Sequence, residues 1–437
     1  MGIKRGYEAI WKKKFSNFMK MWSASLISAV GSGFTGYGLS VWIYLQTGEV
    51  SKYSLISVVT VLPGILIGFF AGVLVDFVNR KKTMLLCDVI NGSLTCCLLG
   101  LLNSGELELW HIYLILSIIS TLSAVRWSAY ASSIVLTVED KDLKRANGLD
   151  QFTNAASQIF PPIFAAIIVN SFLGVGSVIF VDAISYVVSI ILVLQTKIDY
   201  TPPELNNTSI FKKFKDEFLV GLSFLSQRKA LIGLLAYMAI LNYISGGVSV
   251  LFSPMILSFA SEYTLSIIMA VAGFGMIFGS VLVVAVKKME LNTRTILQFS
   301  IVFSVATILA GVFENVPVIC LAGFVFFTSV AVAGSAFQYV FQKNVPTHLQ
   351  GRVFAVRKTI VTSTLPISYL TLGLLADYVF IPFVNNNPVV SFIMGDGNSR
   401  GIGLLLIALG SISIILLFII YYKLNIKKLD LLSLGEK

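Results

Sequence analysis

The chain has 437 residues, of which 56% are apolar and only 12% are charged. A soluble domain would carry roughly a quarter charged residues, so this composition excludes an ordinary water-soluble protein. The net charge of +10 would suit a nucleic-acid partner, but the basic residues are spread between apolar segments along the whole chain. These features predict an integral membrane protein that does not bind nucleic acid.

Apolar segments of roughly 18 to 25 residues recur from one end of the chain to the other, and each can cross a bilayer as a helix. One such segment could be a signal peptide, but a dozen cannot, and the first 20 residues are basic and mixed. We expect an all-α polytopic membrane protein with twelve transmembrane helices in two six-helix halves. The expected spans are residues 21–44, 53–75, 83–102, 111–135, 151–170, 177–195, 230–251, 263–286, 295–313, 316–339, 359–380 and 402–422.

The longest connection between spans divides the chain into its two halves. We expect a cytoplasmic segment at 1–20, an N-terminal half at 21–195, a linker at 196–229, a C-terminal half at 230–422 and a tail at 423–437. Within the linker, apolar residues recur at steps of three and four opposite a lysine-rich face. This spacing predicts an amphipathic helix that lies on the membrane surface.

The positions of the basic residues predict the orientation of the spans. With the N-terminus in the cytoplasm, all but three of the 32 Lys and Arg residues fall in cytoplasmic segments. The exceptions are Lys52 and Arg400 on the outside and Arg126 within the fourth span. Cytoplasmic segments of membrane proteins carry an excess of Lys and Arg, so both termini are expected in the cytoplasm. We expect a monomer in a bacterial cell membrane, with the lipid bilayer as a partner.

Small residues suggest an internal repeat. Gly64, Gly68 and Gly72 follow one another at four-residue steps in the second span, as Gly275 and Gly279 do in the eighth. Small residues at this spacing allow helix backbones to approach closely in a membrane. Repeats of this kind are typical of transporters that move two halves about a central site.

The connection between the second and third spans has a recognisable pattern. It reads Gly72-Val-Leu-Val-Asp76-Phe-Val-Asn-Arg80-Lys81-Lys82. A glycine, an aspartate four residues later and a basic pair resemble the signature loop of the major facilitator superfamily, although Phe77 stands where that family has arginine. The resemblance implies a twelve-helix transporter in which Gly72, Asp76, Arg80 and Lys81 form a gating loop. The alternative is that the basic residues only anchor the loop in the cytoplasm.

Further stretches resemble one branch of that superfamily, the macrolide-efflux-type or third drug:proton antiporter family. They are Leu143–Gln151, Phe180–Tyr186, Gln342–Phe354 and Leu374–Asp377. The resemblance implies efflux of small molecules and antibiotic resistance. It leaves the substrate open, because siderophore exporters and a lysophospholipid transporter belong to the same branch.

Arg126 is the sharpest site candidate, because it is a cation well inside a span. Burying a charge at the middle of a membrane costs about 2.5–3.5 kcal/mol on insertion scales. Ser123, Tyr130 and Ser133 share its helix face, and such a polar stripe must face protein or water. We expect Arg126 and Tyr130 to serve an anionic substrate group or a proton-carrying acid. A structural ion pair is the alternative for Arg126.

Two acids are further candidates for substrate binding or proton coupling. Asp182 lies in the sixth span, and Ser185, Tyr186 and Ser189 extend its face. A carboxyl group in such surroundings can carry a proton, whereas a hydrogen-bonded structural aspartate is the alternative. Asp88 lies less than two turns into the third span, and we expect it beside the gating loop.

Prolines and aromatic residues complete the candidate list. Pro161 and Pro162 interrupt the fifth span and predict a hinge or a static kink. Five aromatic residues are expected to line a central cavity, although an aromatic residue alone is more often a packing residue than a ligand contact. They are Trp42, Trp127, Tyr237, Tyr243 and Tyr339.

The sequence contains no phosphate-binding loop for ATP, so transport is expected to draw on an ion gradient. We expect no enzymatic activity, no cofactor and no metal; the partners are a small-molecule substrate and protons. The expected function is export of an amphipathic molecule (a drug, antibiotic or secondary metabolite) by proton antiport and alternating access. A lipid or lysolipid translocator and a siderophore exporter of the same fold are the alternatives.

Overall fold

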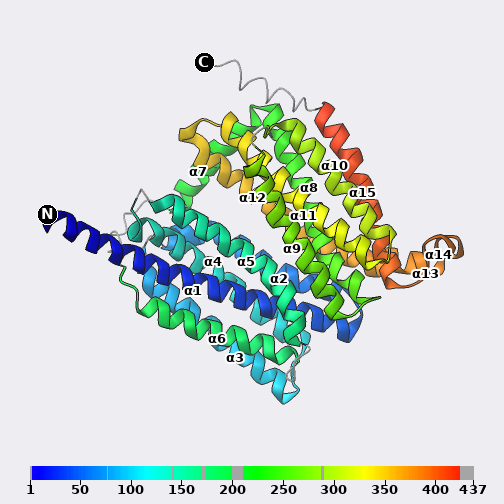
Figure 1. The fold of residues 1–437 in the computed structure, drawn as a ribbon, viewed down its shortest axis with the longest axis horizontal. Coiled ribbons are helices and arrows are strands. Elements are labelled where there is room, and N and C mark those ends of the chain that lie inside the picture. The colour runs from blue at the N-terminus through cyan, green and yellow to red at the C-terminus, as the bar shows by residue number, and fades with distance from the viewer. Residues whose placement is uncertain are drawn as a thin grey trace. The chain divides into compact units, whose positions relative to one another are not determined.

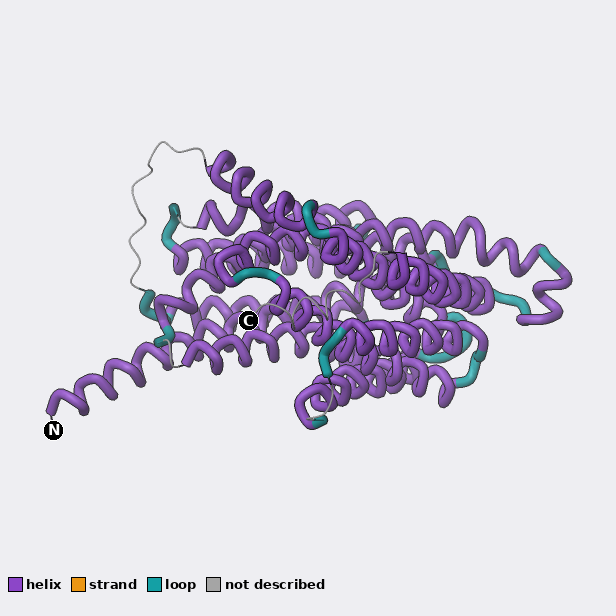
Figure 2. The backbone as a smooth tube through the Cα atoms, turned by 90° about the horizontal axis from the view of Figure 1, so that it is seen from above, coloured by secondary structure: helices purple, strands orange, loops and turns teal. Residues whose placement is uncertain are grey.

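The computed structural model describes residues 2–75, 77–139, 142–169, 174–198, 210–286 and 290–423. All regular elements of that part of the chain are helical (Figure 1). Short loops join long helices throughout this part (Figure 2). The longer helices are α1 Gly2–Thr47, α2 Val50–Val75, α3 Arg80–Ser104, α4 Leu109–Thr137, α5 Leu143–Val169, α6 Val175–Leu194, α7 Ile210–Ser226, α8 Lys229–Leu257, α9 Glu262–Ala285, α10 Thr293–Val312, α11 Val316–Asn344, α12 Gln350–Leu375 and α15 Asn398–Lys423. A π-helical turn at Ala376–Phe380 and the short helices α13 Ile381–Asn386 and α14 Pro388–Met394 join α12 to α15.

Among the described residues, 11 helices are long and apolar enough to cross a membrane. The 27-residue helix α5 lies where the fifth of the expected spans falls. The expected all-helical, multi-pass fold is therefore confirmed. Several boundaries differ from the expectation: α1 begins at Gly2 and not at residue 21, α5 at Leu143 and not at 151, and α12 at Gln350 and not at 359.

Local signals explain where several helices begin. Asn79 caps α3 by accepting a hydrogen bond from the Lys82 amide at 3.1 Å. Asn315 caps α11 in the same way, accepting from the Val318 amide at 3.3 Å. A side-chain acceptor at this position satisfies one of the backbone donors that a helix leaves free at its start.

The chain forms two compact units. The first comprises Met1–Ile43 and Val59–Asn207, and the second comprises Tyr44–Val58 and Thr208–Lys437. The first unit therefore holds most of α1 to α6, and the second holds α7 to α15 together with the residues that join α1 to α2. The linker segment 199–209 and the tail 424–437 lie outside the described residues.

In the first unit, α6 packs closely against α1 and α3. A Cβ atom at Gly31 of α1 would lie 2.2 Å from the Ser185 Oγ of α6, so only glycine fits there without a shift. The Trp22 indole of α1 also donates a hydrogen bond to the Leu149 carbonyl of α5 at 2.8 Å. The contact at Gly31 brings the polar faces of α1 and α6 together.

The glycine repeats have different outcomes in the two units. In α9, a Cβ at Gly275 would lie 2.3 Å from the Phe324 carbonyl oxygen of α11, so this pair of helices does approach closely. Gly279 makes a similar approach one turn later. In α2, however, a Cβ at Gly68 or Gly72 would meet no described atom within 4 Å. The close approach is therefore present for α9, whereas Gly68 and Gly72 of α2 contact no helix among the described residues.

Candidate functional site

A buried ion pair joins α4 to α3 in the first unit. The Arg126 side chain is 6% exposed, and its Nε donates a hydrogen bond to the fully buried carboxylate of Asp88. The guanidinium also donates to the Ser25 Oγ of α1 at 3.1 Å and to the Ser189 Oγ of α6 at 2.9 Å. The sequence required a partner for Arg126, and the structure supplies Asp88, which the sequence had placed beside the gating loop.

Ser189 links both members of this ion pair. Its hydroxyl accepts from Arg126 and donates to the second carboxylate oxygen of Asp88 at 2.8 Å. The guanidinium and the carboxylate therefore each form a hydrogen bond with the other and with the Ser189 hydroxyl. A buried pair of this kind keeps its stability only while both charges are present, because removing one leaves the other buried alone.

Asp182 occupies a second polar cluster, between α6 and α1. It is 1% exposed, and its carboxylate accepts hydrogen bonds from Thr35 at 2.8 Å, from Ser32 at 3.3 Å and from Ser185 at 3.2 Å. Within the described ranges, no Lys, Arg or His lies close enough to Asp182 for an ion pair. Asp182 is thus a buried acid surrounded by hydroxyl groups and not by a cation.

The two clusters share one face of α6. Ser189 belongs to the ion pair, and Asp182 and Ser185 lie one to two turns away on the same helix. Tyr186 lies between them, and its hydroxyl is 2.8 Å from the Ser32 Oγ. Together the clusters contain the carboxylates of Asp88 and Asp182 and the single guanidinium of Arg126. The polar face that the sequence predicted for α6 therefore brings two acids and one base into one buried region.

The gating loop is only partly described, because Asp76 lies outside the described residues. Arg80 Nη1 donates to the Ser132 carbonyl of α4 at 2.6 Å, and Lys81 Nζ donates to the Leu194 and Thr196 carbonyls at the end of α6, at 2.8 and 2.7 Å. Cations at the carboxyl ends of helices are favourable there because of the free carbonyls and the helix dipole. The gating role stays a prediction.

The two prolines of α5 lie in a continuous helix. Pro161 packs on α1: a Cβ at Gly33 would lie 2.5 Å from the Pro161 Cγ. This contact fits a static packing site as well as a hinge, so the hinge stays a prediction. Elsewhere, no group of three or more His, Cys, Asp or Glu side chains suited to a metal ion occurs among the described residues.

The five aromatic candidates have different surroundings. Tyr237 is 4% exposed and packs on Phe337 with a ring separation of 5.4 Å. The Tyr243 hydroxyl is 2.7 Å from the Thr371 Oγ1. Trp127 and Tyr339 are exposed and Trp42 is half-buried. Trp42 and Trp127 belong to the first unit and the tyrosines to the second, so neither unit alone brings all five together.

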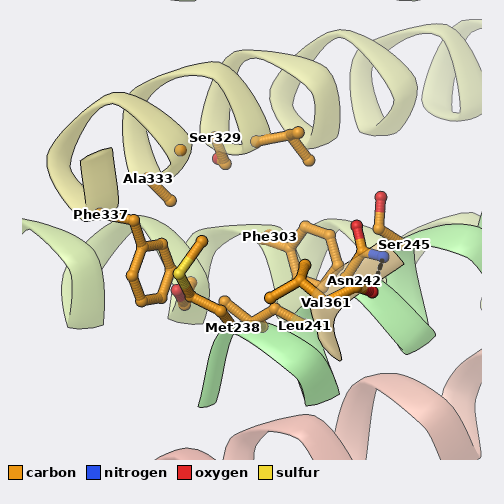
Figure 3. Close-up of a pocket in the computed structure, with 12 residues that line it drawn as sticks. Met238, Leu241, Asn242, Ser245, Phe303, Ser329, Ala333, Phe337 and Val361 are labelled. Atoms are coloured by element: carbon orange, nitrogen blue, oxygen red, sulfur yellow. Dashed lines mark hydrogen bonds between the residues drawn. The ribbon is translucent and has the colours of Figure 1, made fainter. Parts of the chain in front are cut away.

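A pocket of about 130 Å³ lies inside the second unit, between α8, α10, α11 and α12. Met238 and Phe337 lie towards one end of it, and Asn242 and Ser245 lie towards the other (Figure 3). Asn242 Nδ2 donates to the Val361 carbonyl at 2.8 Å. The lining residues are Met238, Leu241, Asn242, Ser245, Ser300, Phe303, Ser329, Val330, Ala333, Gly334, Phe337 and Val361.

Sequence reasoning missed this pocket. Its polar groups are one asparagine and three serines from α8, α10 and α11, and none of them is charged. A polar Asn242 beside Tyr243 in an otherwise apolar span was the only signal that could have indicated it.

The fold and these clusters define a multi-pass helical membrane protein with buried polar groups in its spans. The model of the Major Facilitator Superfamily matches residues 21–369, so the chain belongs to that superfamily. It is 25% identical to macrolide efflux protein A of Streptococcus pyogenes over 377 residues, which cover 84% of this chain and 91% of that protein. It is 26% identical to macrolide efflux protein A of Enterococcus faecalis, over 70% of this chain and 95% of that protein.

Solved structures share the fold at low sequence identity. A bacterial homologue of the human lysosomal transporter Spinster matches with a TM-score of 0.69 and 14% identity, over 96% of this chain and 98% of that chain. A D-xylose–proton symporter matches with a TM-score of 0.64 and 12% identity, over 94% and 98%. These similarities show the fold alone. The superfamily and the macrolide-efflux resemblance inferred from the sequence are confirmed.

Proposed function

We propose that this protein exports an amphipathic small molecule in exchange for protons, by alternating access. Membership of the Major Facilitator Superfamily supports transport of a small molecule across the membrane. The similarity to proteins named for macrolide efflux supports export as the direction. A drug, an antibiotic or a secondary metabolite of amphipathic character is the substrate class that fits these relatives.

The observation that carries proton coupling is the charge balance of the buried clusters in the first unit. Asp88 and Asp182 supply two carboxylates, and Arg126 supplies the one guanidinium. An uncompensated charge costs free energy in a buried site within a span. One bound proton would neutralise the carboxylate that has no cationic partner. We assign that proton to Asp182, since Asp88 already has an ionic partner.

The hydroxyl groups around Asp182 suit a site that gains and loses a proton. Thr35, Ser32 and Ser185 donate to the carboxylate. A hydroxyl can also turn and accept, so the same three groups can receive the proton of a neutral carboxylic acid. Arg126 and Asp88 then act as a fixed ion pair beside the proton site, with Tyr186 between them.

An ion gradient supplies enough energy for this exchange. Moving one proton across 100 mV releases about 2.3 kcal/mol. That energy supports roughly a fortyfold concentration ratio of substrate, since about 1.4 kcal/mol corresponds to a factor of ten. Export against a modest gradient therefore needs only one proton per molecule.

The orientation of the chain is part of the proposal. With both termini in the cytoplasm of a bacterial cell, Asp76 and Arg80 lie on the cytoplasmic side, where they gate access. A cysteine introduced at Asn386 should react with an impermeant reagent from outside intact cells, whereas one at Thr208 should not. The opposite pattern would overturn the orientation.

Reconstituted protein tests the coupling. Purified wild type in liposomes should concentrate a radiolabelled macrolide when a pH gradient is applied. Asp182→Asn should lose this accumulation but still exchange labelled for unlabelled macrolide, because the asparagine cannot release a proton. Asp396→Asn is the matched control, since Asp396 is an exposed acid outside the clusters. Gradient-driven accumulation by Asp182→Asn equal to that of the control would reject the assignment.

A further inference from the structure

The second unit contains a half-buried cation, Arg357. The distribution of Lys and Arg along the sequence assigns it to a cytoplasmic segment. Because α12 begins at Gln350, Arg357 lies on the second turn of that helix. Its Nη2 donates to the Gln338 Oε1 of α11 at 2.5 Å. The guanidinium also lies over the Phe341 ring at 5.1 Å and the Phe354 ring at 5.0 Å.

The hydrogen bonding of this guanidinium is incomplete. Its Nη1 is buried and has no hydrogen-bond partner. No carboxylate of the described residues lies within ion-pair distance of Arg357, although Arg126 in the first unit has Asp88. A buried donor without an acceptor costs free energy, so the Arg357 Nη1 has a donor left that an added acceptor would satisfy.

The apolar pocket of the second unit begins within one to two helical turns of this cation. Val361, which lines the pocket, follows Arg357 by one turn of α12. Phe337, at one end of the pocket, directly precedes Gln338 on α11 (Figure 3). Gly334 also lines it, and a Cβ there would meet no described atom within 4 Å.

We propose that Arg357 and Gln338 bind an anionic group of an amphipathic molecule whose apolar part occupies this pocket. The inference rests on the proposed transport function and adds a class of ligand to it: amphipathic organic anions, bound in the second unit. A carboxylate or a phosphate accepts two parallel N–H bonds from a guanidinium, and Nη1 supplies the free donor. The two phenyl rings hold the guanidinium in place and keep water from its faces.

A packing role alone does not explain the arrangement. Stacking on Phe341 and Phe354 accounts for the position of the guanidinium plane but leaves Nη1 without an acceptor. Arg228 makes the contrast: it also stacks on an aromatic ring, that of Phe224 at 3.8 Å, but its Nη1 donates to the Phe224 carbonyl at 3.2 Å.

Four small probes that share one apolar group separate the contribution of the anionic group to binding from that of the apolar group. They are 4-phenylbutyrate, 4-phenylbutyl phosphate, 4-phenylbutanol and 4-phenylbutylamine, titrated calorimetrically into the full chain in lipid nanodiscs. Wild type should bind at least one of the two anions about tenfold more tightly than the alcohol, since a charge-assisted hydrogen bond contributes about that much. Comparison of the two anions shows whether the site prefers a carboxylate or a phosphate.

Variants test the two parts of the site independently. Arg357→Gln should remove the preference for the anion and leave the alcohol affinity within about twofold of wild type. Arg228→Gln removes a cation of the same unit away from the pocket and should keep the preference. Gly334→Leu should weaken the binding of all four probes by a similar factor, because its side chain would enter the pocket.

The outcomes separate this inference from the proposed function. No preference for either anion in wild type, or a preference that Arg357→Gln retains, would overturn the anion site. Equal losses for all probes in Arg357→Gln would also overturn it, because they would show a packing role only. Proton-coupled macrolide export by wild type would stand in each of these cases, since Asp182 tests it separately.

Discussion

The two units hold their buried arginines in opposite ways. In the first unit, Arg126 donates to Asp88, Ser25 and Ser189, so its charge is compensated inside the protein. In the second unit, Arg357 has only the Gln338 amide and two aromatic rings, and its Nη1 has no acceptor. The two arginines therefore differ in their hydrogen bonds: Arg126 is compensated inside the protein, whereas Arg357 has a donor left for a ligand.

Removing each arginine should produce the largest contrast between the units. Arg126→Ala leaves the Asp88 carboxylate buried without its partner, which costs about 3–5 kcal/mol of folding free energy. Arg357→Ala removes only stacking and one amide contact, at a cost of about 1 kcal/mol. Thermal unfolding of both purified variants in the same detergent checks that Arg126→Ala loses more stability than Arg357→Ala.

A paired substitution controls this comparison. Arg126→Ala combined with Asp88→Ala removes both charges, so it should recover much of the stability that the single change loses. A well-folded, active Arg126→Ala single variant would show that the ion pair contributes little and would remove the proposed distinction.

The Arg126→Lys substitution keeps the positive charge but removes the planar guanidinium, so it tests whether the geometry of Arg126 matters. Lysine cannot reproduce the planar arrangement that joins Asp88, Ser25 and Ser189. If this geometry serves the proton site, Arg126→Lys should reduce proton-driven transport at least tenfold per folded molecule while leaving the protein folded. Retained transport would make the pair a structural one, and the measurement is liposome uptake normalised to folded protein.

Two glycines give a smaller contrast between the units. A Cβ at Gly31 would collide with the Ser185 side chain, whereas one at Gly334 would meet no described atom within 4 Å. Gly31→Ala should therefore cost about 1–3 kcal/mol and weaken proton coupling, because Ser185 must move away from Asp182. Gly334→Ala should be neutral or stabilise by up to about 1 kcal/mol, because alanine favours a helix. Equal unfolding temperatures for the two variants would contradict the close approach of α1 and α6.

The sequence predicted the fold and the polar face of α6. The length of the apolar segments indicated the helices. The spacing of Asp182, Ser185, Tyr186 and Ser189 predicted that they share one face of α6, because helical spacing is a local property. The pairing of Arg126 with Asp88 depends on how α3 packs on α4, which no local pattern specifies. The sequence therefore did not predict that Asp88 is the partner of Arg126.

The polar elements of the second unit were harder to predict for a different reason. Arg357 follows a basic connection, so its charge counted towards a cytoplasmic segment, and only the early start of α12 places it within a helix. The pocket is formed by uncharged residues from four helices, α8, α10, α11 and α12. Such a site exists only once the helices have packed.

In the proposed function, the buried clusters of the first unit hold one exchangeable proton on Asp182. A pH-sensitive dye in weakly buffered solution can count the protons released when a macrolide is added to detergent-purified protein. Wild type and Asp396→Asn should each release close to one proton per molecule bound, and Asp182→Asn should bind the macrolide and release none. Proton release by Asp182→Asn equal to that of wild type would contradict the claim.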